Sequence, residues 1–277
     1  MQFTVTTLVE NTVAQSGNAL LGEHGLSFYI EAGDRRILFD TGQNLAISNN
    51  ARVLGIDLNQ IDTVVLSHGH YDHSGGLKSI LASNKDFTLY GHPDVFSPKV
   101  KKTNGHYKYI GIPVEKNDIV DCGISLQLSR DPVEIAPGVM TSGEIALEND
   151  FEDAEPMFFL KKDEKVTPDT LADDQALILD TAKGLVVLLG CSHRGVINTL
   201  THIARLKDNG RIHAILGGLH LGKASDAKLA KIIDHLRGFD PEMLGVGHCT
   251  GPQAFLALAN EFEDRVFLNT VGNVIEF

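Results

Sequence analysis

The sequence predicts an α/β fold in which helices cover buried sheets, and two observations support this prediction. In the first half of the chain, short runs rich in Val, Ile, Leu and Phe are bounded by turn residues, which indicates strands over residues 3–10, 26–32, 35–39 and 61–67. After Asp174, similar runs alternate with segments whose apolar residues recur at i, i+3 and i+4, as in amphipathic helices. Strands with helices in both halves of a chain imply sheets buried beneath helices.

The same patterns place the remaining elements. We expect a helix over residues 44–54, a short helix over about 76–82 and a strand over 87–90. In the second half we expect strands over 176–180, 185–189, 212–216, 243–246, 266–269 and 274–277. Helices are expected there over 196–207, 227–236 and 253–262.

The region from about residue 92 to 165 differs from both halves because it holds six of the nine prolines. We interpret it as irregular loops and short strands that border the active site, since loops on a rigid scaffold often carry specificity. Its apolar content does not indicate a separate core. We therefore expect one domain over residues 1–277 with a variable, loop-rich region at about 92–165.

Composition excludes several classes of protein. The 277 residues are 43% hydrophobic and carry a net charge of -12, which argues against a large nucleic-acid-binding surface. The one basic run, Lys99, Lys101 and Lys102, is interpreted as a solvated surface. No secretory signal or membrane-spanning run is present, and three cysteines without a CxxC pair suit a reducing cytoplasm. We expect a cytoplasmic protein that acts on a small molecule, with no nucleic-acid or membrane partner; the sequence does not indicate an oligomeric state.

The segment Ser-His-Gly-His-Tyr-Asp-His-Ser-Gly-Gly at residues 67–76 carries the chemistry. Three histidines and an aspartate fall within six residues, directly after an apolar strand. Imidazole nitrogens and carboxylate oxygens bind transition metals at about 2.0–2.2 Å. In a tight loop, His68 and His70 can address one metal, while Asp72 and His73 address its neighbour.

Three later segments each show a strand, then glycine, then histidine. His193 follows the strand at 185–189, His220 follows 212–216, and His248 follows 243–246. This arrangement brings each imidazole to the end of a strand, so that we expect His193 and His248 as ligands. His220 is expected as a ligand or as a proton donor to substrate. His92, His106 and His24 are further pocket candidates, whereas His202, His213 and His235 are interpreted as structural.

The HxHxDH segment, followed by Gly75-Gly76 and preceded by Phe39-Asp40-Thr41-Gly42, resembles the signature of the metallo-β-lactamase superfamily. The resemblance covers essentially the whole chain and implies a four-layer αβ/βα sandwich with two metals at one edge. It implies that Asp40 supports a ligand histidine or the loop. The third histidine usual before Ala176 is absent, and Cys191 stands at the usual place of the bridging aspartate. Either His193 substitutes for that histidine, or Cys191 supplies a thiolate.

Further segments narrow the resemblance to the branch named for the archaeal dihydropterin–ribofuranosylaminobenzene 5′-phosphate synthase. They include Glu23-His24 and His248-Cys249-Thr250-Gly251, which make Glu23, His24 and Thr250 candidate pocket residues. The branch name implies a transferase that forms a C–N bond on a pterin pyrophosphate.

We expect a hydrolase of a small ester, lactone, amide or phosphoester that uses a metal-activated water. Asp72 would orient the water and His220 would protonate the leaving group. The alternatives are the pterin transferase and a non-enzymatic, metal-bound ligand sensor. Zinc is the expected metal, with manganese or iron as alternatives, because mixed His/Asp sites accept all three. The sequence contains no GxSxG, P-loop or dinucleotide motif.

Overall fold

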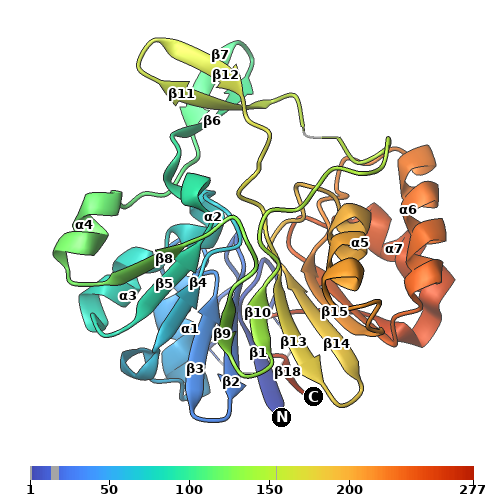
Figure 1. Cartoon of the computed structure of the whole chain (residues 1–277), viewed down its shortest axis with the longest axis horizontal. Helices are drawn as coiled ribbons and strands as arrows, with labels where there is room; N and C mark the ends of the chain where they lie inside the picture. Colours follow the sequence, from blue (N-terminus) through green and yellow to red (C-terminus); the bar gives the residue numbers. More distant parts are fainter. Residues whose placement is uncertain (1, 14–18, 154) are drawn as a thin grey trace.

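Two seven-stranded sheets form the centre of the computed structural model, which describes residues 2–13, 19–153 and 155–277 (Figure 1). Apolar residues of both sheets form one shared core between them. A second core lies between the first sheet and its helices, and a third lies between the second sheet and its helices. The order of layers is therefore helix, sheet, sheet, helix, as the resemblance to the metallo-β-lactamase superfamily implies.

The first sheet and its helices come mainly from the first half of the chain. Its strand order is β18-β1-β2-β3-β4-β5-β8. The strands are β1 (Phe3–Val9), β2 (Ser27–Ala32), β3 (Arg35–Phe39), β4 (Thr63–Val65), β5 (Thr88–Gly91), β8 (Ser125–Leu128) and β18 (Val274–Glu276). The helices are α1 (Ala46–Leu54), α2 (Tyr71–Ser74), α3 (Leu77–Ser83) and α4 (Lys116–Asp121).

The second sheet has the order β17-β16-β15-β14-β13-β10-β9. Its strands are β9 (Glu134–Ala136), β10 (Val139–Thr141), β13 (Leu177–Thr181), β14 (Gly184–Leu189), β15 (Ile212–Gly218), β16 (Met243–Gly247) and β17 (Val266–Leu268). Helices α5 (Val196–Leu206), α6 (Asp226–Phe239) and α7 (Pro252–Phe262) cover its outer face. Within the described residues, no helix is long and apolar enough to cross a membrane.

The middle region is more regular than the sequence predicts. Its short strands are confirmed, but they build sheets instead of irregular loops, and α4 also lies there. Strands β6 (Lys99–Thr103), β7 (His106–Tyr109), β11 (Phe158–Lys162) and β12 (Lys165–Pro168) form a third sheet, in the order β12-β11-β6-β7, that stands at one end of the sandwich (Figure 1). Two local hairpins, β6–β7 and β11–β12, are joined by the pairing of β6 with β11, and because these two strands are distant in sequence, no local pattern reveals the complete sheet.

The ends of several strands position the site. Strands β3, β4 and β5 are parallel, as are β14, β15 and β16, so the loops that follow them lie along the edges where these strands end. Four non-glycine residues of these loops adopt a left-handed backbone: Asp40, Ser192, His220 and His248, with φ between 50° and 61°. Such conformations cost energy and cluster at functional sites.

Candidate metal centre

The loop after β4 brings two histidines of the motif together. Close packing explains the glycine between them, because a Cβ at Gly69 would lie 2.0 Å from the carbonyl oxygen of Val95. The Gly69 N–H donates to Asp173 Oδ2 at 2.8 Å. The backbone between His68 and His70 is thus held from two sides.

The first group of ligand atoms comes from His68, His70 and His193. His70 Nδ1 lies 3.0 Å from His68 Nε2 and 3.1 Å from His193 Nε2. All three residues are buried. Nitrogens bound to one tetrahedral zinc at 2.0–2.1 Å are roughly 3.3 Å apart, so these atoms are close to the spacing of a metal site.

The second group comes from Asp72, His73 and His248. His73 Nε2 lies 3.1 Å from His248 Nε2, and Asp72 Oδ2 lies 3.6 Å from His248 Nε2 and 4.0 Å from His73 Nε2. His68 and His70 thus share one potential ligand group and Asp72 and His73 share another, while a further potential group joins His68 with His73.

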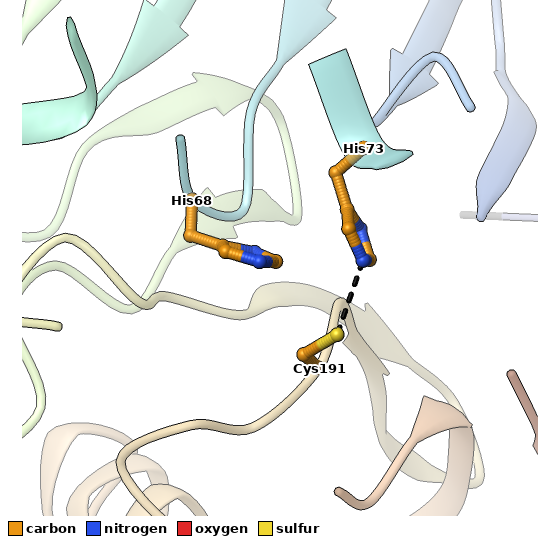
Figure 2. Close-up of side chains that lie close together, drawn as sticks. All are labelled: His68, His73 and Cys191. Atoms are coloured by element: carbon orange, nitrogen blue, oxygen red, sulfur yellow. Dashed lines mark hydrogen bonds between the residues drawn. The ribbon is translucent and has the colours of Figure 1, made fainter. Parts of the chain in front are cut away.

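Cys191 lies between the groups. Its Sγ atom is 3.1 Å from His73 Nε2, and its side chain forms a further potential ligand group with His68 and His73 (Figure 2). Figure 2 shows the two imidazoles and the thiol directed toward one another. His193 and Cys191 thus both lie within the candidate site, so each of the two alternatives from the sequence is geometrically possible.

Outer contacts orient these ligand atoms. Asp40 Oδ2 accepts from His73 Nδ1 at 2.6 Å and from Ser67 Oγ at 2.7 Å. Ser67 Oγ in turn lies 2.9 Å from His68 Nδ1. His248 Nδ1 lies 3.1 Å from Asn11 Oδ1. Each contact occupies the Nδ1 atom and leaves Nε2 free to bind a metal, as outer partners of metal-ligating histidines commonly do.

The donor set fits a divalent cation better than a hydrogen-bond network. The Ser67 hydroxyl proton goes to Asp40, so that Ser67 accepts the proton of His68 Nδ1 and His68 Nε2 presents a lone pair. A proton on His70 Nδ1 can then be donated in a hydrogen bond to either His68 Nε2 or His193 Nε2, but not to both. A cation among the three nitrogens would accept all three lone pairs.

The pKa shifts agree with this assignment. Burial lowers the pKa of His68, His70, His193 and His248 well below 6.5, which keeps these imidazoles neutral, the state that binds metals. Burial also acts to lower the pKa of His73, but Asp40 raises it to about 9. The surroundings of His73 therefore favour a positive charge, and either a proton or a bound metal ion would supply that charge.

Two more histidines complete the site. His24 Nε2 lies 3.3 Å from Asp72 Oδ2, and the His24 ring stacks on His248 with centroids 5.1 Å apart. The His220 ring lies 4.2 Å from that of His193 and pairs with Glu155. Burial acts to lower the pKa of His220, but contacts with Cys249 and Glu155 raise it to about 10.

A cavity of about 310 Å³ opens over both ligand groups. It is large enough for a small molecule. Its lining includes Asp72, His193, His220, His248 and Cys191, together with Tyr71, Lys101, Ile110, Phe158 and Lys223. Lys101, Ile110, Glu155 and Phe158 of this lining belong to the proline-rich region.

Several candidates lie elsewhere. Glu23 accepts the N–H groups of Asn44 and Leu45 near the start of α1, and Thr250 Oγ1 accepts the N–H of Leu219, so neither lines the cavity. His92 contacts Glu144 and Asp94, and His106 is exposed on β7. His202 contacts the Ser142 carbonyl, His213 contacts Glu242, and His235 lies exposed on α6.

The prediction that Lys99 is solvated is wrong. Its side chain is 1% exposed, and its Nζ atom lies 2.8 Å from both Asp169 Oδ2 and Asp173 Oδ1. Because Asp173 also holds the Gly69 N–H, this ion network joins β6 to the loop of His68 and His70. No local pattern distinguishes Lys99 from its exposed neighbour Lys102.

Comparison with known proteins agrees with this geometry. The sequence model that describes the metallo-beta-lactamase superfamily matches residues 21–248 of this chain. The chain belongs to the metallo-β-lactamase superfamily. This fold implies binding of a divalent metal, and the two groups of His and Asp atoms are the candidate ligands.

Two archaeal relatives cover nearly the whole chain. The 7,8-dihydropterin-6-methyl-4-(beta-D-ribofuranosyl)-aminobenzene-5'-phosphate synthase of Methanocaldococcus jannaschii is 33% identical over 272 residues, covering 92% of this chain and 90% of the relative. An uncharacterized protein of the same organism is 34% identical over 254 residues, covering 91% and 92%. The crystal structure of Tm1679, a metal-dependent hydrolase of the β-lactamase superfamily, matches with a TM-score of 0.85 and 30% identity, covering 99% of each chain.

Three contributors to the site carry no local signal in the sequence. Glu155 pairs with His220, Phe158 contacts the rings of His70 and His193, and Asn11 holds His248. Each is isolated among unrelated residues. Only the fold brings them to the candidate ligand histidines.

Proposed function

We propose that the chain is a metal-dependent hydrolase of a small ester, lactone, amide or phosphoester. The observation that carries this proposal is the meeting of two ligand groups, His68/His70/His193 and Asp72/His73/His248, beneath one cavity of about 310 Å³. The similarity to Tm1679, a metal-dependent hydrolase, supports the same reaction class. Both the site and the relative thus favour metal-assisted hydrolysis of a small molecule.

Each group would hold one divalent metal. Metals there would supply Lewis acidity, which makes water acidic near neutral pH and stabilises negative charge that develops on the substrate. Zinc suits this donor set, because four neutral imidazoles and the Cys191 thiol are nitrogen and sulfur donors that zinc prefers. Manganese and iron are the alternatives.

Residues around the groups have separate roles in the proposed reaction. Asp72 Oδ2 would orient the nucleophilic water as well as bind a metal, because it faces both His24 and His248. His220 would protonate the leaving group, because it lines the cavity. Its Nε2 pairs with Glu155, whereas Nδ1 is buried without a partner among the described residues.

The test is an ester, lactone, amide and phosphoester panel with metal-loaded protein. We expect turnover that is lost after chelation and in His70→Ala, and retained in the matched variant His106→Ala, because His106 is exposed outside the cavity. Metal analysis of each variant accompanies the assay. Turnover that survives in metal-free His70→Ala protein would contradict the proposal.

A second candidate is the transferase reaction, favoured by 33% identity to the archaeal synthase over 272 residues. In this reaction the C–O bond of a pterin pyrophosphate would break, pyrophosphate would leave with the bonding electrons, and an amine would form the new C–N bond and lose a proton. Mass spectrometry of a pyrophosphorylated pterin incubated with an aromatic amine would detect the adduct. Release of pyrophosphate with pterin alcohol but no adduct would favour hydrolysis.

A metal-bound ligand sensor is the remaining alternative. Ligand binding without metal-dependent turnover in either assay would support the sensor and contradict both enzymatic proposals. Under every alternative we propose a small-molecule ligand and no nucleic-acid partner, because the chain carries a net charge of -12.

A further inference from the structure

Two lysines from different elements line the cavity beside the ligand histidines. Lys101 lies on β6 of the third sheet, and Lys223 follows β15 of the second sheet. Within the described part of the chain, neither lysine forms an ion pair with a carboxylate. Unpaired cations beside a concave site are available to bind an anionic ligand.

The acidic residues of the same cavity are already engaged. Asp72 contacts His24, and Glu155 pairs with His220. Burial acts to raise the pKa of Glu155, but His220, Lys223 and Lys101 lower it. Lys101, Lys223 and Glu155 all line this cavity, and the lowered pKa of Glu155 agrees with positive charge there.

Phe158 connects this end to the ligand histidines. On β11 it is the register partner of Lys101, whose Nζ atom lies 5.8 Å from the ring centroid. The same ring lies 5.1 Å from the centroid of His70 and 5.4 Å from that of His193. A molecule resting against Phe158 would lie between the ligand histidines and the Lys101 ammonium.

The charge of the third sheet is opposite to that of the whole chain. Its four strands carry six lysines besides the paired Lys99 and no acidic residue, and the turn between β11 and β12 adds Asp163 and Glu164, whereas the whole chain has a net charge of -12. This sheet stands at one end of the sandwich (Figure 1). Its strands β6 and β11 supply Lys101 and Phe158 to the lining of the cavity. An anion would therefore be attracted to the cavity against the overall repulsion of the protein.

We propose that Lys101 and Lys223 form a subsite for the phosphate group of a small aromatic or apolar substrate that packs on Phe158. A phosphate dianion matches two ammonium groups, each of which can donate charge-assisted hydrogen bonds. This inference rests on the proposed function and deepens it, because it selects phosphorylated molecules from the proposed substrate classes.

The test measures binding of phenyl phosphate, benzoate and neutral benzamide to the metal-loaded protein by calorimetry. In Lys101→Gln and in Lys223→Gln, the dissociation constant for phenyl phosphate should rise about 10-fold, as expected for the loss of one charged contact. Benzamide binding should be unchanged, and Lys101→Arg should retain most of the affinity. Lys102→Gln is the matched control, because Lys102 lies next to Lys101 but its Nζ is over Tyr107, outside the cavity.

Equal phenyl phosphate affinity in wild type, Lys101→Gln and Lys223→Gln would overturn the subsite. So would an equal loss in Lys102→Gln, which would indicate only a general charge effect, or tighter binding of benzoate than of phenyl phosphate, which would indicate a carboxylate site. The contribution of the metals to phenyl phosphate affinity is the same in all variants, so it cancels when their dissociation constants are compared. Lysine-dependent binding without turnover would refute the proposed hydrolase alone, whereas metal-dependent turnover without lysine-dependent binding would refute the subsite alone.

Discussion

Replacing Lys99 by methionine would test the buried ion network that supports the ligand loop. The variant keeps the apolar stem but removes the ammonium group that lies 2.8 Å from Asp169 Oδ2 and Asp173 Oδ1. The side chains of Lys99, Asp169 and Asp173 are 1%, 5% and 1% exposed, so water cannot replace the lost cation. Removing one member of a buried ion pair typically costs about 3–5 kcal/mol, and we expect a loss of that size in the free energy of unfolding.

Protonation of Lys99 determines the conditions for the assay. Burial acts to lower the pKa of Lys99, but Asp173 and Asp169 raise it above 10.5. Because the folded-state pKa lies above the unfolded value, the stabilisation is fully present at neutral pH and is lost only as the pH rises through the raised pKa. Urea denaturation at pH 7 of wild type, Lys99→Met and the exposed control Lys102→Met therefore measures the full effect.

The same variant should also weaken metal binding. Without Lys99, Asp173 is no longer fixed where its Oδ2 accepts the Gly69 N–H between His68 and His70. Loss of such outer support typically lowers metal affinity about 10–100-fold, which competition with a chromophoric chelator would measure. A loss of less than about 1 kcal/mol in the free energy of unfolding, together with unchanged metal affinity, would refute the reasoning. Leaving buried carboxylates without a counterion should destabilise the folded protein by more than this.

Three further substitutions test individual contacts. Cys191→Ser should abolish the thiolate-to-metal absorption of the cobalt-substituted protein, and a persistent band would show that Cys191 is not a ligand. Asp40→Asn should weaken metal binding about 10–100-fold in chelator competition; unchanged affinity would contradict its supporting role. Gly69→Ala should destabilise the protein by more than about 1 kcal/mol in thermal melts, because its Cβ would lie 2.0 Å from the Val95 carbonyl oxygen. Gly238→Ala, with open space in α6, should instead stabilise it by about 0.5–1 kcal/mol, and similar effects at both glycines would refute the packing argument.

Features that depend on residues close together in the chain could be predicted from the sequence alone. Apolar periodicity placed the main strands and helices, because burial of one face imposes a period along the chain. The spacing of His68, His70, Asp72 and His73 sorted them between two groups, since a tight loop constrains residues one or two positions apart. The segments of strand, glycine and histidine predicted His193 and His248 as metal ligands, because each histidine lies a few residues after the end of a strand. Both residues lie in potential ligand groups.

Features that depend on pairing between distant segments could not be predicted without the three-dimensional fold. The third sheet forms because β6 pairs with β11, more than 50 residues later, and this pairing brings Phe158 beside Lys101. It buries Lys99 and leaves Lys102 exposed, although the sequence treats both as surface lysines. Glu155 and Asn11 likewise gain their contacts with His220 and His248 from the fold. The physical reason is that ion pairing and burial depend on distance in space, which a single sequence specifies only through the whole packed chain.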